Sequence, residues 1–168
     1  MNSDLYLEKN ISQQPAIDLL TAMGYTYISP ADCDKQRGSR YHVLLRDILR
    51  GQLRRLNRYA YAGAENEFSA ANIERAMEDL DEPLTDGLVR TSEKIYDALL
   101  LGKSYPETVG EGKMLSFNLK YIDWDNPQNN VFHVTEEFAV DSRDRQHNAR
   151  PDIVLFINGI PFAVIECK

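Results

Sequence analysis

The hydrophobic period of this chain changes near Gly102, and this change limits the folds that the chain can adopt. Before Gly102 the apolar residues recur at helical spacing, which predicts helices over residues 16–23, 41–57, 70–80 and 92–101. After Gly102 the pattern alternates, which predicts strands over residues 105–109, 114–122 and 131–140 and on both sides of Asn158-Gly159. Residues 25–28 could form one more short strand, and the order of helices followed by antiparallel strands predicts an α/β or α+β fold.

The composition is typical of one folded domain, residues 1–168, and not of a membrane protein. Of the 168 residues, 43% are hydrophobic and 27% are charged, and no run of 18 apolar residues could cross a membrane. The first twenty residues lack the basic start and apolar core of a secretory signal, so the expected compartment is the cytoplasm. The two cysteines, Cys33 and Cys167, suggest neither a disulfide framework nor a zinc motif.

Charge is distributed unevenly along the chain. The net charge of −7 argues against a simple nucleic-acid coat, yet residues 35–58 hold eight basic residues against one acid. Residues 65–86 hold eight acids against one arginine. Within the basic segment four arginines recur every four residues and so share one side of the predicted helix: Arg46, Arg50, Arg54 and Arg58. Three interpretations stay open, namely contact with DNA phosphates, a solvated helix face, or pairing with the acidic segment.

The last eighteen residues carry the side chains best suited to catalysis. Asp152 begins one apolar strand and Glu166-x-Lys168 ends the next, so Glu166 and Lys168 share a face. Charges at the ends of buried strands are costly unless they are paired or bind a metal. An Asp/Glu pair suits Mg²⁺, which would lower the pKa of a bound water and stabilise charge on a phosphate. Lys168 could hold or deprotonate that water, or stabilise the developing negative charge.

The register of the hairpin decides whether these groups can share a site. A strict two-residue Asn158-Gly159 loop would pair Asp152 with Ile165 and place Asp152 and Glu166 on opposite faces. A three-residue loop over 157–159, with glycine in the left-handed position, would pair Asp152 with Val164 and place the two acids and Lys168 on one face. We therefore predict the bulged three-residue loop. In the plainer alternative the hairpin merely has polar ends, and Glu166 and Lys168 form a solvated terminus.

A polar, basic loop precedes the hairpin. Arg143, Arg145 and Arg150 lie in it, close in sequence to Asp152. We expect these three arginines near the mouth of the site, where they could contact phosphate.

Two stretches resemble a known family. Pro151-Asp152 with Glu166-Cys167-Lys168 resembles the PD-(D/E)xK nuclease motif. The segment over residues 119–132, LKYIDWDNPQNNVF, resembles the IDxDNPxNNxF stretch in the N-terminal domain of type I restriction enzyme R subunits, and residues 150–168 resemble the nuclease hairpin of that domain. The resemblance extends over the whole chain, more loosely around residues 44–57.

The resemblance implies a restriction-endonuclease-like PD-(D/E)xK core, in which a mixed central sheet is flanked by helices. It also implies a Mg²⁺-dependent endonuclease module for double-stranded DNA. Asp152 and Glu166 match the metal-binding acids, Lys168 the catalytic lysine, and the carbonyl of Cys167 the main-chain metal ligand. For the acid that the family carries on its first helix, Glu8 and Asp18 are candidates, while Gln13 and Gln14 lie near the expected place. The family's modification and specificity subunits are the implied partners.

The chain also departs from the family. It stops at Lys168, where the family continues into a further helix and an ATP-driven motor, so we expect an N-terminal fragment whose fold is incomplete at its C-terminal end and which is inactive alone. The sequence has no GxxxxGK[ST] motif, so we expect ATP to be used by the full-length enzyme and not by this part. The alternative function is a non-catalytic docking or regulatory domain with the same fold.

Overall fold

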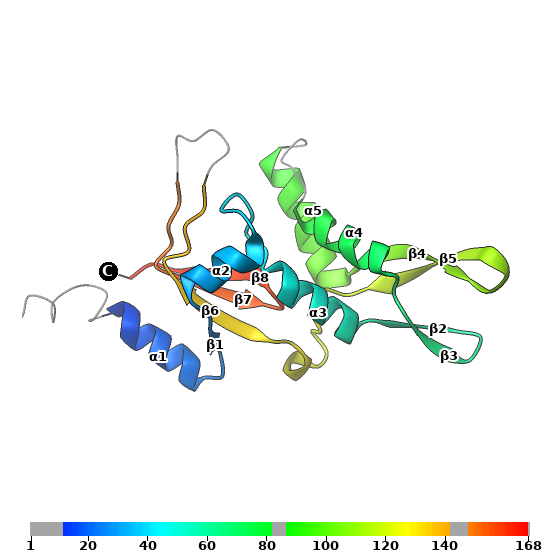
Figure 1. Ribbon diagram of the computed structural model, residues 1–168, viewed down its shortest axis with the longest axis horizontal. Helices are drawn as coiled ribbons and strands as arrows, with labels where there is room; N and C mark the ends of the chain where they lie inside the picture. The colour runs from blue at the N-terminus through cyan, green and yellow to red at the C-terminus, as the bar shows by residue number, and fades with distance from the viewer. Residues whose placement is uncertain (1–11, 82–86, 142–147, 168) are drawn as a thin grey trace, which may run out of the picture. The chain divides into compact units, whose positions relative to one another are not determined.

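The computed structural model describes residues 12–81, 87–141 and 148–167. These residues contain five α-helices and eight strands, which confirms the mixed α and β architecture (Figure 1). The chain divides into two compact units, Met1–Arg46 with Val131–Lys168, and Asp47–Asn130. None of the helices in the described ranges is long and apolar enough to cross a membrane. That residues 1–168 act as one endonuclease domain stays a prediction.

The first unit is built on a four-stranded mixed sheet. Its strand order is β1-β6-β7-β8, with β1 (Thr26–Tyr27) parallel to β6 (Phe132–Glu136). The strands β7 (Ile153–Ile157) and β8 (Ile160–Ile165) continue the sheet as antiparallel neighbours. Segments from the two ends of the chain therefore build one sheet, and the predicted C-terminal hairpin is confirmed.

Helices pack on both faces of this sheet. On one face α1 (Gln14–Ala22) buries Ile17 against Val134 and Ile153. On the other face α2 (Pro30–Arg37), in front of the strands in Figure 1, places the Arg37 guanidinium 4.1 Å from the centre of the Phe138 ring, and Phe138 meets Phe156 edge to face. Ile153 and Phe156 point to opposite faces because they lie three residues apart on one strand. Helix α2 was not predicted.

The predicted strand over 131–140 is shorter than expected. Strand β6 ends at Glu136, because Glu137 adopts a left-handed backbone with φ 51°. A non-glycine residue in that region cannot continue a pleated strand. The end of β6 therefore comes directly beside the start of the motif strand β7.

The second unit begins with α3 (Arg46–Leu56), which starts later than the predicted residue 41. An unpredicted hairpin follows, β2 (Arg58–Tyr61) with β3 (Ala64–Glu67), so Arg58 lies on a strand and not on the helix with the other arginines. The remaining elements agree with the expected type: α4 (Ala70–Leu80), α5 (Leu88–Leu101), β4 (Lys103–Val109), β5 (Lys113–Leu119) and a 3₁₀ turn at Pro127–Asn129.

Two buried tyrosine hydroxyls connect elements of the second unit by hydrogen bonds. The Tyr105 and Tyr121 hydroxyls lie 2.9 Å apart, Tyr105 donates to Asp79 at 2.6 Å, and Tyr121 donates to the Ala76 carbonyl at 2.9 Å. Burial raises the pKa of Tyr121 to about 12 and that of Tyr105 further, so both hydroxyls stay neutral. These bonds join α4 to β4 and to the segment after β5.

Candidate functional site

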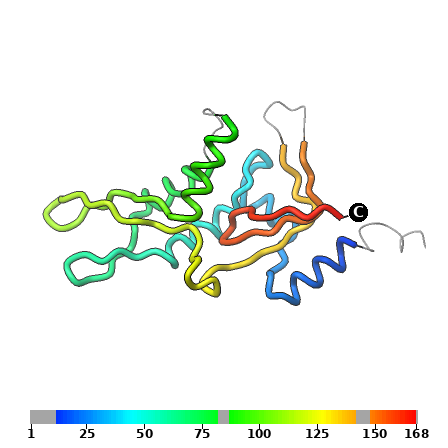
Figure 2. Tube along the Cα trace, turned by 180° about the vertical axis from the view of Figure 1, so that it is seen from behind, coloured from blue at the N-terminus to red at the C-terminus, as the bar shows by residue number. Residues whose placement is uncertain are grey.

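The C-terminal hairpin, orange to red in Figure 2, turns in two residues and not in the predicted three. Ile157 pairs with Ile160, while Asn158 and Gly159 have φ values of 54° and 83°, as in a type I′ turn. The prediction of a bulged three-residue loop is therefore wrong. Asn158 stabilises the tight turn from within: its amide oxygen accepts from Val131 N at 2.9 Å, and its own N donates to Val131 O at 2.8 Å.

A bulge inside β8 shifts the register of the hairpin by one residue. Asp152 and Glu166 are thereby returned to the same face of the sheet, which a two-residue turn without a bulge would not allow. Phe156 pairs with Pro161 but Leu155 pairs with Ala163, which leaves Phe162 as the extra residue. Beyond the bulge Ile153 pairs with Ile165, and continuing this register by one residue places Asp152 opposite Glu166. Directly opposed residues share a face, so the strands carry the two acids toward the same side.

One main-chain amide holds the Asp152 carboxylate. Its Oδ2 accepts a hydrogen bond from Cys167 N at 2.7 Å, which joins the start of β7 to the residue after Glu166. Asp152 is half-buried and Glu166 is exposed. Lys168 lies outside the described residues.

Helix α1 contacts the motif through a glutamine. Gln13 Nε2 donates to the main-chain oxygen of Asp152 at 3.1 Å and to Glu136 Oε2 at 3.3 Å. Glu136 Oε1 accepts from the Tyr27 hydroxyl at 3.1 Å, and burial, followed by this carboxylate, raises the pKa of Tyr27. Sequence reasoning placed Gln13 near the expected position of the family's helix acid but predicted no contact for it, and Pro15, two residues later, marked the first turn of the helix.

Of the helix-acid candidates, Asp18 is exposed and accepts a hydrogen bond from Gln14 at 2.9 Å. Glu8 lies outside the described residues. In the described part of α1, the residue at the motif is therefore Gln13 and not an acid.

Glu137 contacts the motif from the other side. Its N donates to the Asp152 carbonyl at 2.9 Å, and its carboxylate forms an ion pair with Arg150. This pair lines an open cleft of about 260 Å³. The other residues that line the cleft are Pro30, Arg40, Glu136 and Ala139. Arg150 is 63% exposed, and its predicted place near the mouth of the site, in contact with phosphate, stays a prediction.

The other predicted arginines are placed differently. Arg143 and Arg145 lie outside the described residues. Arg50 is held by two carboxylates, Glu74 at 2.5 Å and Asp47 at 2.8 Å, and Arg58 pairs with Glu67. Two of the four periodic arginines thus pair with the acidic segment over residues 65–86, which is one of the three interpretations given above. Of the other two, Arg54 is exposed and Arg46 is half-buried.

The donor atoms at the hairpin suit Mg²⁺. The described residues contain no group of three or more His, Cys, Asp or Glu side chains that could hold a metal. A metal here would therefore take the two carboxylates of Asp152 and Glu166, the Cys167 carbonyl, water and substrate oxygens. All of these are hard oxygen donors, and Mg²⁺ in proteins commonly binds one or two carboxylates in addition to water and phosphate.

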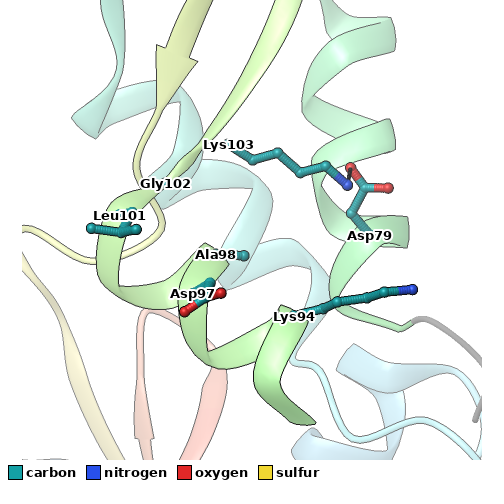
Figure 3. Close-up of a pocket in the computed structure, with 7 residues that line it drawn as sticks. All are labelled: Asp79, Lys94, Asp97, Ala98, Leu101, Gly102 and Lys103. Atoms are coloured by element: carbon teal, nitrogen blue, oxygen red, sulfur yellow. Dashed lines mark ion pairs between the residues drawn. The ribbon is translucent and has the colours of Figure 1, made fainter. Parts of the chain in front are cut away.

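A separate pocket lies in the second unit. Its volume is about 400 Å³, and its charged lining residues are Asp79, Lys94, Asp97 and Lys103. Figure 3 shows Lys103 directed toward Asp79, with which it forms an ion pair of 2.9 Å. Two acids balance two lysines, so the pocket has no charge preference for phosphate.

The stretch over residues 119–132, which resembles the IDxDNPxNNxF motif, contains a turn stabilised by side-chain hydrogen bonds. Asp123 N donates to Asn130 Oδ1, and Asn130 Nδ2 returns a bond to the Asp123 carbonyl, both at 2.9 Å. Asn129 donates to the Asp123 carboxylate at 2.9 Å, and the Lys120 ammonium lies 3.0 Å from it. These contacts give the motif a structural role in the second unit.

Comparison with known proteins finds one matching family and two similar proteins. Residues 5–168 match the family described as type I restriction enzyme R protein N terminus. Two relatives in Methanocaldococcus jannaschii carry the names type I restriction enzyme MjaVIIIP endonuclease subunit and MjaIXP endonuclease subunit. The first is 31% identical over 128 residues, which cover 76% of this chain and 11% of the relative. The second is 27% identical over 165 residues, which cover 96% of this chain and 15% of the relative.

Proposed function

Because this chain belongs to the family of type I restriction enzyme R protein N-termini, we propose that it is the DNA endonuclease module of such an enzyme. It hydrolyses phosphodiester bonds of double-stranded DNA with Mg²⁺, on a PD-(D/E)xK core, in the cytoplasm. Its partners are the modification and specificity subunits, and ATP is used by motor domains outside this chain. The observation that carries the proposal is the β8 bulge, which sets Asp152 opposite Glu166.

The residues at the hairpin have distinct roles in this proposal. Asp152, Glu166 and the Cys167 carbonyl would hold Mg²⁺, which supplies Lewis-acid stabilisation of phosphate charge and a more acidic bound water. The Cys167 amide fixes the Asp152 carboxylate, so its free rotation is lost before substrate binds. Lys168 orients the attacking water or stabilises the negative charge that develops on the phosphate.

The test is Mg²⁺-dependent cleavage of plasmid DNA by the full assembly. We expect Asp152→Ala, Glu166→Ala and Lys168→Ala each to abolish cleavage while ATP-driven translocation continues, because translocation does not use the metal site. Asp125→Ala serves as the matched control, since Asp125 is an exposed acid outside the hairpin. We expect the isolated 168-residue chain to be nearly inactive, since in this proposal the motor domains and the specificity subunit hold the DNA in place. Wild-type cleavage by all three variants would favour the docking or regulatory alternative.

A further inference from the structure

A buried arginine lies next to the cleft that Arg40 and Arg150 line. The guanidinium of Arg37 is buried, and it donates to Asp34 Oδ1 at 2.5 Å and to the Ala139 carbonyl at 2.6 Å. Burying a charged pair is costly, and apolar side chains in the same place often give equal or greater stability. Stability alone is therefore a weak explanation for this pair.

Asp34 connects the buried arginine to an exposed one. Its Oδ2 accepts from Arg40 Nε at 3.2 Å and from Arg40 Nη2 at 3.1 Å, and its pKa is lowered, first by the hydrogen bond from Arg37. These contacts restrain the Arg40 side chain, which is still 54% exposed. Because a guanidinium carries more N–H donors than these two bonds use, Arg40 can bind a second acceptor at the same time.

Main-chain contacts place Arg40 and Arg150 at one cleft. The Arg40 carbonyl accepts from Asp141 N at 3.0 Å, and the neighbouring Val140 pairs with Ala149. Arg150 follows Ala149 directly in the sequence. The two arginines thus come from segments that are hydrogen-bonded together, and both line the open cleft of about 260 Å³.

Glu137 connects this cleft to the nuclease motif. Its carboxylate pairs with Arg150, and its N donates to the Asp152 carbonyl at 2.9 Å. Its φ of 51° lies in the left-handed region, which is uncommon for a residue other than glycine and is found more often at functional sites. The cleft therefore lies directly beside Asp152.

The charges at the cleft favour an anion. The three arginines of this network face two carboxylates, those of Asp34 and Glu137. Glu136 also lines the cleft, but its two oxygens accept hydrogen bonds from Gln13 and Tyr27. Exposed guanidinium groups suit a phosphate, which arginine binds through parallel N–H donors. The volume of about 260 Å³ is below the roughly 300–1,000 Å³ of sites for whole small molecules, so it suits a single phosphate group.

We propose that this cleft binds a backbone phosphate of the DNA, near the phosphate that is cleaved, and that Arg40 and Arg150 hold it jointly. Arg40 is thus a further DNA contact, and Asp34 restrains its direction. The phosphate site rests on the proposed function, because that function places DNA at Asp152.

DNA-binding titrations of the full assembly at several salt concentrations, with EDTA to prevent cleavage, test the proposal. Arg40→Ala should weaken binding and lower the slope of log K against log salt by about 1. The double variant Arg40→Ala with Arg150→Ala should also lower the slope by about 1, because the two arginines neutralise the same phosphate. Arg90→Ala is the matched control and should leave the slope unchanged, since Arg90 is an exposed arginine of α5.

Arg40→Lys separates the charge from the shape of the side chain. It should keep the wild-type slope and bind DNA several-fold more weakly, because lysine keeps the charge but lacks the planar fork. An unchanged slope for Arg40→Ala would overturn the proposal. A fall of about 2 in the double variant would also overturn it, since the arginines would then contact separate phosphates. So would a fall that Arg40→Lys does not reverse, since the lost charge would then not be its cause.

Cleavage by Asp152→Ala is measured in parallel in Mg²⁺. Abolished cleavage together with an unchanged Arg40→Ala slope would reject the phosphate site and leave the proposed nuclease in place. Wild-type cleavage by Asp152→Ala together with a lowered Arg40→Ala slope would reject the nuclease and keep a phosphate contact at the cleft. The two proposals can therefore fail separately.

Discussion

Gln13 donates a hydrogen bond to the main-chain oxygen of Asp152 at 3.1 Å, although 139 residues separate the two in sequence. Gln13 is only 4% exposed, and the same Nε2 also donates to Glu136. The bond joins the start of α1 to the residue directly before the motif strand β7, without touching the Asp152 carboxylate. Gln13 is therefore a positioning residue in the proposed active site.

Gln13→Ala should slow DNA cleavage by the full assembly about 10- to 100-fold, the range typical when an outer partner of a metal site is lost. The physical reason is that Asp152 loses one of the bonds that orient it, so the Mg²⁺ concentration for half-maximal cleavage should rise. Gln14→Ala is the matched control, because the neighbouring Gln14 is exposed and bonds to Asp18. Equal cleavage rates and Mg²⁺ dependence for both variants would show that Gln13 has no positioning role.

Arg150→Ala should weaken DNA binding by the full assembly and reduce the slope of log K against log salt by about 1. Arg150 is exposed, is paired with Glu137, and lies two residues before Asp152. Arg50→Ala should leave the slope unchanged, since Arg50 is only 29% exposed and two carboxylates already hold it. Binding titrations at several salt concentrations measure both, and equal slopes would contradict the assignment.

The sequence predicted well those elements whose ends are marked by local chemistry. Ser69 begins α4 and accepts from Asn72 N at 3.3 Å, and Gly102 ends α5. Helix α2 was missed because its buried residues, Cys33 and Arg37, form no apolar pattern. Arg37 is instead stabilised by Asp34, by the Ala139 carbonyl and by the Phe138 ring, contacts that only the folded chain creates.

The candidate site was predicted in composition but not in geometry. Asp152 and Glu166 could be identified from residue type and spacing, yet the position of the β8 bulge could not. The turn register depends on long-range contacts, such as Leu45 N to Gly159 O at 2.9 Å and Val131 N to the Asn158 side chain. The contacts of Gln13 could not be predicted for the same reason, since its partners are over 100 residues away in sequence.

Asn158→Ala should lower the free energy of unfolding by about 1–3 kcal/mol, because Val131 N loses its partner in a partly buried place. Alanine also fits the left-handed backbone at φ 54° less well than asparagine. Urea unfolding of the chain measures the change. Asn66→Ala is the control, since Asn66 bonds to Ala64 O on the exposed β2–β3 hairpin, and an equal loss there would contradict a special role for Asn158.

Asp123→Asn should remove an acid-sensitive part of the stability of the second unit. The pKa of Asp123 is lowered, first by the hydrogen bond from Asn129 and then by that from Lys120. A carboxyl whose pKa is lower in the folded state stabilises the fold above its unfolded pKa of about 4, and this contribution is lost as the pH falls through the folded value. Wild type should therefore unfold at a higher temperature than Asp123→Asn at pH 7, and the difference should shrink steadily below about pH 4.

Asp125→Asn is the control because Asp125 is exposed. Thermal unfolding curves between neutral and acid pH measure all three proteins, and a difference between wild type and Asp123→Asn that grew as the pH fell would contradict the assignment.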